Sequence, residues 1–323
     1  MTVVPDAGAP LEPQQHAVGR TVSLLVDEQR DARALGIDCW YPAAPDDHSK
    51  SFYEILPGVG FTSSAFEDPP AAEGPHPLII WSHGRSGTRM VYGMVCEGLA
   101  ARGYVVISAD HPGDTLADWL LGTAVDDATN ETQRVADMRF VLDAALRARP
   151  GLDLAAAIDT SRIAVAGHSY GGFTALALAG SDPSDPRVRA VAGLQSLTRS
   201  LSRKTLARIE VPTMLIVGMQ DKTTPPEVDA DRAFEALGNT ARRVDFDNAG
   251  HQACSDVGLY LELAPQVEGL PEIVFEYLQS MAADVTGTAG DPWRPTLAVH
   301  LETLGGFLDE ALNRGSARTE MSP

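Results

Sequence analysis

The chain has 323 residues, of which 44% are hydrophobic, so it is long enough to bury a substantial core. Its 25 basic and 44 acidic residues give a net charge of −19, which disfavours binding to nucleic acid or to anionic membranes. No apolar run approaches the roughly 18 residues of a membrane span. The N-terminus lacks a basic segment followed by an apolar one, so we expect no secretory signal.

The chain contains three cysteines, Cys39, Cys96 and Cys254. An odd number without a CxxC pair argues against a disulfide framework and favours a reduced, cytoplasmic protein. A secreted protein trimmed of its signal peptide would have the same sequence. Metal-ligand spacings such as HExxH are absent, so no metal is expected.

Residues 1–18 are expected to be a flexible lead-in, and strand-like segments follow at 21–26 and 36–42. The stretch at 43–76 is rich in Pro, Gly and Ser and predicts a loop or a loose hairpin rather than a domain linker. From there on, short apolar strands alternate with helical patterns. The predicted strands are 76–83, 104–110, 162–167, 187–195, 211–221 and 241–250, and the predicted helices are 90–103, 131–150, 173–180, 225–238, 271–285 and 297–314, with a polar helix-like segment at 197–209.

This alternation predicts an α/β fold with a mostly parallel, doubly wound sheet of about eight strands and helices on both faces. We find no internal repeat and no second core, so residues 1–323 are predicted to form a single domain with a frayed tail at 315–323. Ligands of such sheets bind at the carboxyl ends of the strands, so chemistry is expected in the turns that follow them.

One of these turns carries the sequence GHSYGG at 167–172, with Ser169 at its centre. The G-x-S-x-G pattern alone is common. Here an apolar β-branched strand precedes it and an Ala- and Leu-rich helix follows, which is the context of a nucleophile elbow. Small residues at Gly167 and Gly171 suit a turn this tight. We therefore predict that Ser169 is a nucleophile rather than an ordinary serine in a Gly-rich turn.

A serine hydroxyl needs a base, which is usually a histidine oriented by a carboxylate, in the chain order Ser, Asp, His for this architecture. His251 follows the last predicted strand and is the preferred base. His300 lies inside a helical pattern and is expected to be a surface or packing residue. Asp221 ends an apolar strand 30 residues before His251 and is the preferred acid, which would hold the imidazole in one tautomer.

A tetrahedral intermediate needs two N–H donors. The backbone N–H of Tyr170, directly after the nucleophile, is one candidate. The other is the backbone N–H of Arg85, in the loop SHGRSG after the strand at 76–83. Three further residues are candidates for the pocket wall, with packing as the alternative for each: His168, His111 and Trp119.

The segments WSHGRSG, GHSYGG, VGMQDKTTPP and NAGHQ together resemble the α/β-hydrolase superfamily. Within it, the chain resembles bacterial serine esterases related to dienelactone hydrolases and to platelet-activating-factor acetylhydrolases, over residues 20–280. The resemblance departs at two points. Dienelactone hydrolases proper carry a cysteine nucleophile where this chain has Ser169. Acetylhydrolases carry their acid after the strand that follows the nucleophile helix, where this chain has Gln195, so the acid function falls to Asp221.

The sequence therefore predicts a serine esterase that cleaves carboxylic esters through an acyl-enzyme, with a small-molecule ester substrate and no cofactor. Peptidase or amidase activity and lactone or polyester hydrolysis use the same triad and remain alternatives. A non-catalytic scaffold on the same fold is a further alternative, which the complete triad disfavours. The sequence leaves the natural substrate, the acyl-chain length and the oligomeric state open.

Overall fold

The computed structural model describes residues 4–12, 14–44, 47–56, 59–147, 152–286 and 292–313. The tail at 315–323, which was predicted to fray, lies outside the described residues. The described part of the lead-in runs beside strand β4, because the Ala7 N–H donates to the Thr62 carbonyl oxygen at 2.8 Å and the Thr62 N–H donates to the Pro5 carbonyl oxygen at 2.9 Å.

The strands of the described residues form one ten-stranded sheet in the order β10-β9-β8-β7-β5-β6-β2-β1-β4-β3. From β10 to β6 neighbouring strands run parallel, whereas β2 is antiparallel to both β6 and β1. The strands are β1 Ala17–Asp27, β2 Arg33–Ala43, β3 Lys50–Leu56, β4 Val59–Glu67, β5 His76–Ser82, β6 Val105–Ala109, β7 Ile158–His168, β8 Val188–Leu194, β9 Thr213–Gly218 and β10 Ala241–Phe246.

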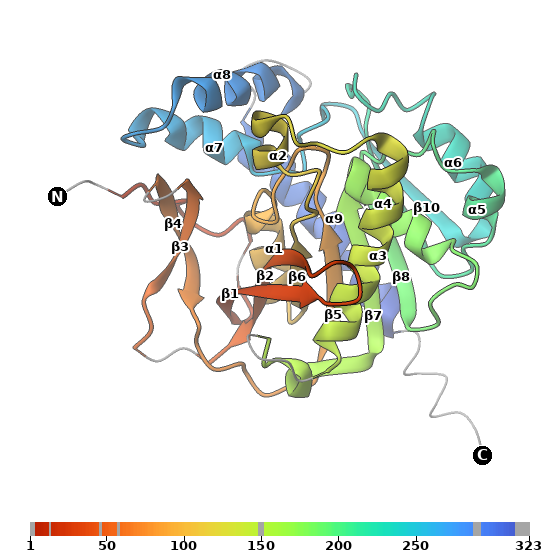
Figure 1. The fold of residues 1–323 in the computed structure, drawn as a ribbon, viewed down its shortest axis with the longest axis horizontal. Coiled ribbons are helices and arrows are strands. Elements are labelled where there is room, and N and C mark those ends of the chain that lie inside the picture. The colour runs from red at the N-terminus through yellow and green to blue at the C-terminus, as the bar shows by residue number, and fades with distance from the viewer. Residues whose placement is uncertain are drawn as a thin grey trace.

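Helices cover both faces of the sheet, as the alternation predicted (Figure 1). Along β5, Leu78 and Ile80 point into the core formed with α3, α4 and α6, while Ile79 and Trp81 point into the core formed with α1 and α9. The helices are α1 Gly93–Ala101, α2 Leu116–Leu121, α3 Asp127–Ala145, α4 Tyr170–Ala179, α5 Arg203–Ala207, α6 Ala230–Leu237, α7 Val257–Leu263, α8 Glu272–Met281 and α9 Trp293–Asn313.

The sheet has ten strands where the sequence predicted about eight. The two extra strands, β3 and β4, form an antiparallel hairpin inside the segment 43–76. Its aromatic side chains belong to the core: Tyr53 and Phe61 are 1% and 2% exposed and stack with their ring centroids 5.1 Å apart. Of the two structures that the sequence left open for this segment, a loop or a loose hairpin, the hairpin is confirmed.

Helices α7 and α8 lie together beyond the sheet, beside α2 (Figure 1). They follow His251 in the chain and precede the long helix α9. An aromatic contact joins α8 to α2, because the rings of Tyr277 and Trp119 lie 5.0 Å apart. This helical insertion covers the sheet edge at which the sequence placed the chemistry.

Candidate active site

Ser169 lies at a sharp turn between β7 and α4. Its backbone has φ 55° and ψ −116°, a strained conformation for a residue other than glycine. The neighbouring glycines have no room for a side chain. A Cβ on Gly171 would lie 1.9 Å from the Ser82 carbonyl oxygen, and a Cβ on Gly167 would lie 2.5 Å from the Gly171 carbonyl carbon. The motif thus has the strand, tight turn and helix of a nucleophile elbow.

Ser169, His251 and Asp221 meet at this turn. The Ser169 Oγ lies 2.9 Å from His251 Nε2, and His251 Nδ1 lies 2.7 Å from an Asp221 carboxylate oxygen. Asp221 follows β9 and His251 follows β10, so the loops after two adjacent parallel strands bring both side chains to the elbow. Their exposed fractions are 7% for Ser169, 5% for His251 and 4% for Asp221.

The Asp221 carboxylate is held by its own turn. One oxygen accepts the backbone N–H groups of Thr223 and Thr224, each at 2.8 Å, and the other accepts the Thr224 hydroxyl at 2.6 Å. Burial raises the pKa of Asp221, but the hydrogen bonds from His251 and Thr224 outweigh it and hold that pKa below its ordinary value. The ionised carboxylate accepts the Nδ1 proton of His251, which leaves Nε2 free to accept the Ser169 proton.

Gln195 occupies the turn after β8, at the position where the sequence resemblance led us to look for an acid. Its backbone carbonyl oxygen lies 2.9 Å from the Thr224 hydroxyl oxygen, so it packs against the turn that holds Asp221. Its side-chain nitrogen lies 3.2 Å from His300 Nε2. His300 itself is a packing residue, because it is buried and stacks on Phe246 with ring centroids 4.2 Å apart.

The two backbone groups predicted to bind an oxyanion belong to segments that adjoin Ser169. Tyr170 is the first residue of α4, so its N–H has no acceptor within the helix. Arg85 follows Gly84 in the loop after β5 and lines the same cavity as Ser169. This loop approaches Ser169 closely, since a Cβ on Gly84 would lie 3.4 Å from the Ser169 Cβ.

His168 also lines this cavity and links the two loops around the nucleophile. Its Nε2 lies 2.7 Å from the His251 carbonyl oxygen, and its Nδ1 lies 2.7 Å from the Tyr92 hydroxyl, which in turn accepts the Gly84 N–H at 3.1 Å. A carbonyl only accepts, so Nε2 carries the ring proton and Nδ1 accepts from Tyr92. Burial lowers the pKa of His168, in keeping with a neutral ring. No spacing in the sequence points to Tyr92.

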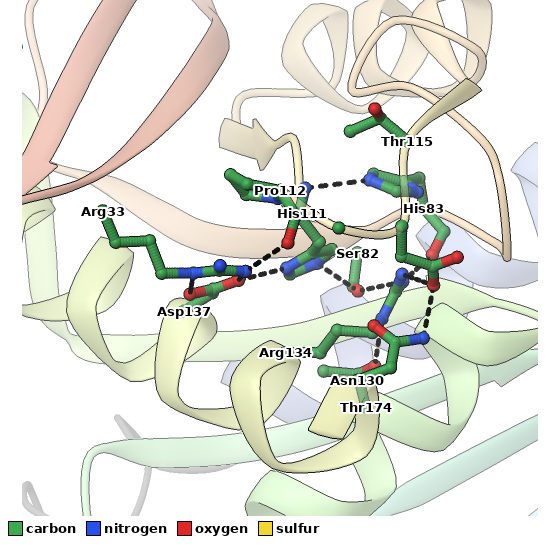
Figure 2. Close-up of polar contacts among 12 residues, drawn as sticks. Arg33, Ser82, His83, His111, Pro112, Thr115, Asn130, Arg134, Asp137 and Thr174 are labelled. Atoms are coloured by element: carbon green, nitrogen blue, oxygen red, sulfur yellow. Dashed lines mark hydrogen bonds and ion pairs between the residues drawn. The ribbon is translucent and has the colours of Figure 1, made fainter. Parts of the chain in front are cut away.

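His111 and Trp119 lie outside the described cavity wall. His111 is 1% exposed, with Nε2 2.9 Å from Ser82 Oγ and Nδ1 3.0 Å from Asp137, in a buried polar cluster (Figure 2). Trp119 is 47% exposed and packs on the ring of Tyr277, which lines the cavity.

The cavity beside Ser169 has a volume of about 300 Å³. Its floor includes the elbow and the Gly84–Arg85 loop, together with His251. Its roof comes from α7, α8 and the segment between them, which the sequence predicted only in part as a closing helix at 271–285. The apolar roof residues that line the cavity include Val257, Leu263, Leu270, Val274, Leu278 and Met281.

Other kinds of site find no support in the described part of the chain. No group of three His, Cys, Asp or Glu side chains there could hold a metal ion. No helix there has the length and apolarity needed to cross a membrane. Cys39, Cys96 and Cys254 are buried free thiols.

Comparisons with known proteins agree with this fold. The family model described as PET hydrolase-like matches residues 60–262. A probable 1-alkyl-2-acetylglycerophosphocholine esterase of Arthroderma benhamiae is 32% identical over 113 residues, which are 31% of this chain and only 27% of that relative. The structure of a ferulic acid esterase from Streptomyces cinnamoneus superposes with a TM-score of 0.73 at 24% identity, covering 96% of this chain and 94% of that one.

The parallel sheet, the elbow and the structural likeness define an α/β-hydrolase, the superfamily that the sequence motifs predicted. The chain belongs to the PET hydrolase-like family within it, because the family model covers more than half of its length. The family model and the Arthroderma relative, whose name describes an esterase, agree with the family resemblance that the sequence motifs predicted. The likeness to the Streptomyces enzyme bears on the fold alone.

Proposed function

We propose that this protein hydrolyses carboxylic esters of small molecules through an acyl-enzyme formed on Ser169. His251 is the general base and then the general acid, and Asp221 holds its tautomer and stabilises the imidazolium. The backbone N–H groups of Arg85 and Tyr170 bind the oxyanion. The chemistry requires no cofactor.

In the first half-reaction His251 Nε2 takes the Ser169 proton as Oγ attacks the ester carbonyl. The carbonyl oxygen becomes an oxyanion between the two backbone donors, and each such donor typically contributes about 10²–10³ in rate. His251 then returns the proton to the departing alkoxide, which leaves as the alcohol. In the second half-reaction water attacks the acyl-enzyme with the same base, and the acid is released as Ser169 recovers its proton.

The observation that carries this proposal is the hydrogen-bonded chain from Ser169 through His251 to Asp221, on an elbow that opens into a cavity. Its test is pre-steady-state kinetics with a p-nitrophenyl ester. We expect a burst of one p-nitrophenol per chain, and labelling by a fluorophosphonate that peptide mass spectrometry assigns to Ser169. A fluorophosphonate that leaves Ser169 unlabelled would support the non-catalytic scaffold instead.

Polyester hydrolysis is a second candidate, because the chain belongs to a family described as PET hydrolase-like. The position of Ser169 disfavours it, since a polymer chain must lie across the nucleophile whereas Ser169 is only 7% exposed and shares its cavity with residues of α7 and α8. Release of soluble acids from a polyester film at a rate comparable to that on a small ester would reverse this ranking. Turnover of a peptidyl amide without turnover of esters would favour a peptidase.

A further inference from the structure

The roof of the cavity presents its apolar side to Ser169. Along α8, Val274 and Leu278 line the cavity and are only 6% and 8% exposed, whereas Ile273 and Phe275 on the outer side are 55% and 36% exposed. The elbow contributes Ser169, His168 and His251 to the lining, whereas the roof contributes mostly apolar side chains together with Tyr260 and Tyr277. The cavity thus has the reactive hydroxyl on one side and a mostly apolar roof on the other.

We propose that the substrate is an ester with an apolar group of several carbons on one side of the scissile bond, and that this group binds beneath α7 and α8. This inference rests on the proposed esterase function and names the substrate class of the same site. Water that fills an apolar cavity is displaced favourably by hydrocarbon. Each buried methylene contributes up to about fourfold in kcat/KM.

The test compares p-nitrophenyl acetate, butyrate and octanoate below their aggregation concentrations, and repeats the series with alkyl acetates of rising alcohol length. We expect kcat/KM to rise at least about tenfold over four added methylenes in one of the two series. A flat or falling profile in both series would overturn the proposal while leaving the esterase function intact. Absence of turnover and of fluorophosphonate labelling for every ester would overturn both.

Variants of α8 distinguish a loss of substrate binding under the roof from a general loss of folding. We expect Leu278→Gln to lower kcat/KM for the preferred long ester at least about tenfold and for the acetate less than twofold. Val274→Thr, which keeps the side-chain volume, should give a smaller loss of the same kind. The matched control is Ile273→Gln on the outer side, which should change neither substrate. Equal losses on long and short esters in both roof variants would contradict the proposal.

The contacts of the buried Arg134 support a second inference, which is independent of the cavity. Arg134 is fully buried on α3, and its guanidinium contacts both segments that bear the predicted oxyanion donors (Figure 2). Its Nη2 donates to the His83 carbonyl oxygen, two residues before Arg85. Its Nε donates to the Thr174 hydroxyl at 3.1 Å, and that hydroxyl donates to the Tyr170 carbonyl at 2.7 Å.

A buried carboxylate completes this arrangement. Arg134 Nη1 lies 2.7 Å from one oxygen of Asp114, which also accepts the Asn130 amide at 2.6 Å. The other oxygen of Asp114 accepts the Ser86 N–H at 3.1 Å, directly after Arg85. The peptide groups on both sides of the Arg85 N–H are therefore held from α3, as is the carbonyl of Tyr170.

The geometry points to Arg134 as a positioning residue that sets the spacing between the Arg85 and Tyr170 N–H groups. Preorganised donors stabilise the transition state more than the ground state, so a displaced donor lowers kcat and leaves KM nearly unchanged. Thr174 offers the mildest test, because Thr174→Val keeps the shape of the side chain and removes the hydroxyl that joins Arg134 to Tyr170.

We expect Thr174→Val to lower kcat by about tenfold with KM within twofold, and to weaken binding of a trifluoromethyl ketone by the same factor as kcat/KM. Thr174→Ser keeps the hydroxyl and should retain activity within twofold. The control is Thr213→Val, which removes another buried hydroxyl, bonded to the Val211 carbonyl at 3.1 Å and remote from the elbow. Equal losses in Thr174→Val and Thr213→Val, or no rescue by Thr174→Ser, would overturn the assignment.

Discussion

The molecule contains two hydrogen-bonded chains of the same three residue types with nearly the same distances. In the first, Ser169–His251–Asp221, the Ser–His distance is 2.9 Å and the His–Asp distance is 2.7 Å. In the second, Ser82–His111–Asp137, these distances are 2.9 and 3.0 Å. Distance alone therefore does not single out a nucleophile.

Access and charge distinguish the two chains. Ser169 lies at a strained elbow and lines the cavity, whereas Ser82 is fully buried at the end of β5. Arg134 also donates to Ser82 Oγ at 3.1 Å. Burial and the nearby Arg134 charge lower the pKa of His111 to about 4. A weakly basic imidazole beside a serine that is fully buried and does not line the cavity favours a structural role for Ser82–His111–Asp137.

The largest expected difference follows from removing each serine hydroxyl. Ser169→Ala should lower kcat for a p-nitrophenyl ester by at least about 10⁴-fold without unfolding the protein, because the attacking atom is lost. Ser82→Ala should retain kcat within about tenfold and lower the free energy of unfolding by about 1–3 kcal/mol, since buried donors lose their partner. Urea titration and initial rates measure the two effects. Comparable activity losses would show that both serines take part.

The carboxylate of Asp221 should matter for catalysis because it fixes the tautomer of the His251 imidazole. Asp221→Asn should lower kcat by about 10⁴-fold, because the amide favours the wrong tautomer of His251. Initial rates with a p-nitrophenyl ester measure this loss, and a loss below tenfold would contradict the role given to Asp221.

Much of this site could be predicted from the sequence because its residues lie in turns beside regular strands. The elbow is a local pattern, and Asp221 and His251 each follow an apolar strand in a fixed order along the chain. Tyr92 and Arg134 could not be found this way, since their roles depend on contacts between segments far apart in sequence. The sequence left the segment 43–76 open between a loop and a loose hairpin for a similar reason, because the packing of Tyr53 on Phe61 decides between them.

The next largest expected effect is on the free energy of unfolding when Asp137, the carboxylate that contacts His111, is replaced. Asp137 is fully buried and contacts Arg30 at 2.7 Å, Arg33 at 2.8 Å and His111. Burial raises the pKa of Asp137, but the hydrogen bonds from His111 and Arg33 outweigh it and hold that pKa well below its ordinary value. Asp137→Asn should therefore lower the free energy of unfolding by about 3 kcal/mol, measured by urea titration, while kcat per labelled Ser169 stays within about tenfold.

The matched control for this variant is Asp159→Asn. Asp159 pairs with Arg162 at 2.6 Å in a partly exposed, local ion pair, so its loss should lower the free energy of unfolding by less than about 1 kcal/mol. Equal destabilisation by the two substitutions would mean that the buried ion pairs of Asp137 contribute no more to the free energy of unfolding than the partly exposed pair of Asp159. A collapse of kcat in Asp137→Asn alone would place this carboxylate in the chemistry.

The smallest expected effect is a pH dependence of stability from His111. Its pKa is about 4 in the folded protein and 6.5 when unfolded, so between these values the unfolded chain binds more protons. Stability contributed by the neutral ring is therefore present above pH 6.5 and is lost as the pH falls toward 4. From pH 7.5 to 5 the loss is about 2 kcal/mol. His111→Gln should remove this part of the slope, whereas Thr213→Val should keep the wild-type slope. Parallel slopes in wild type and His111→Gln would mean that folding leaves the pKa of His111 unchanged, and would contradict this prediction.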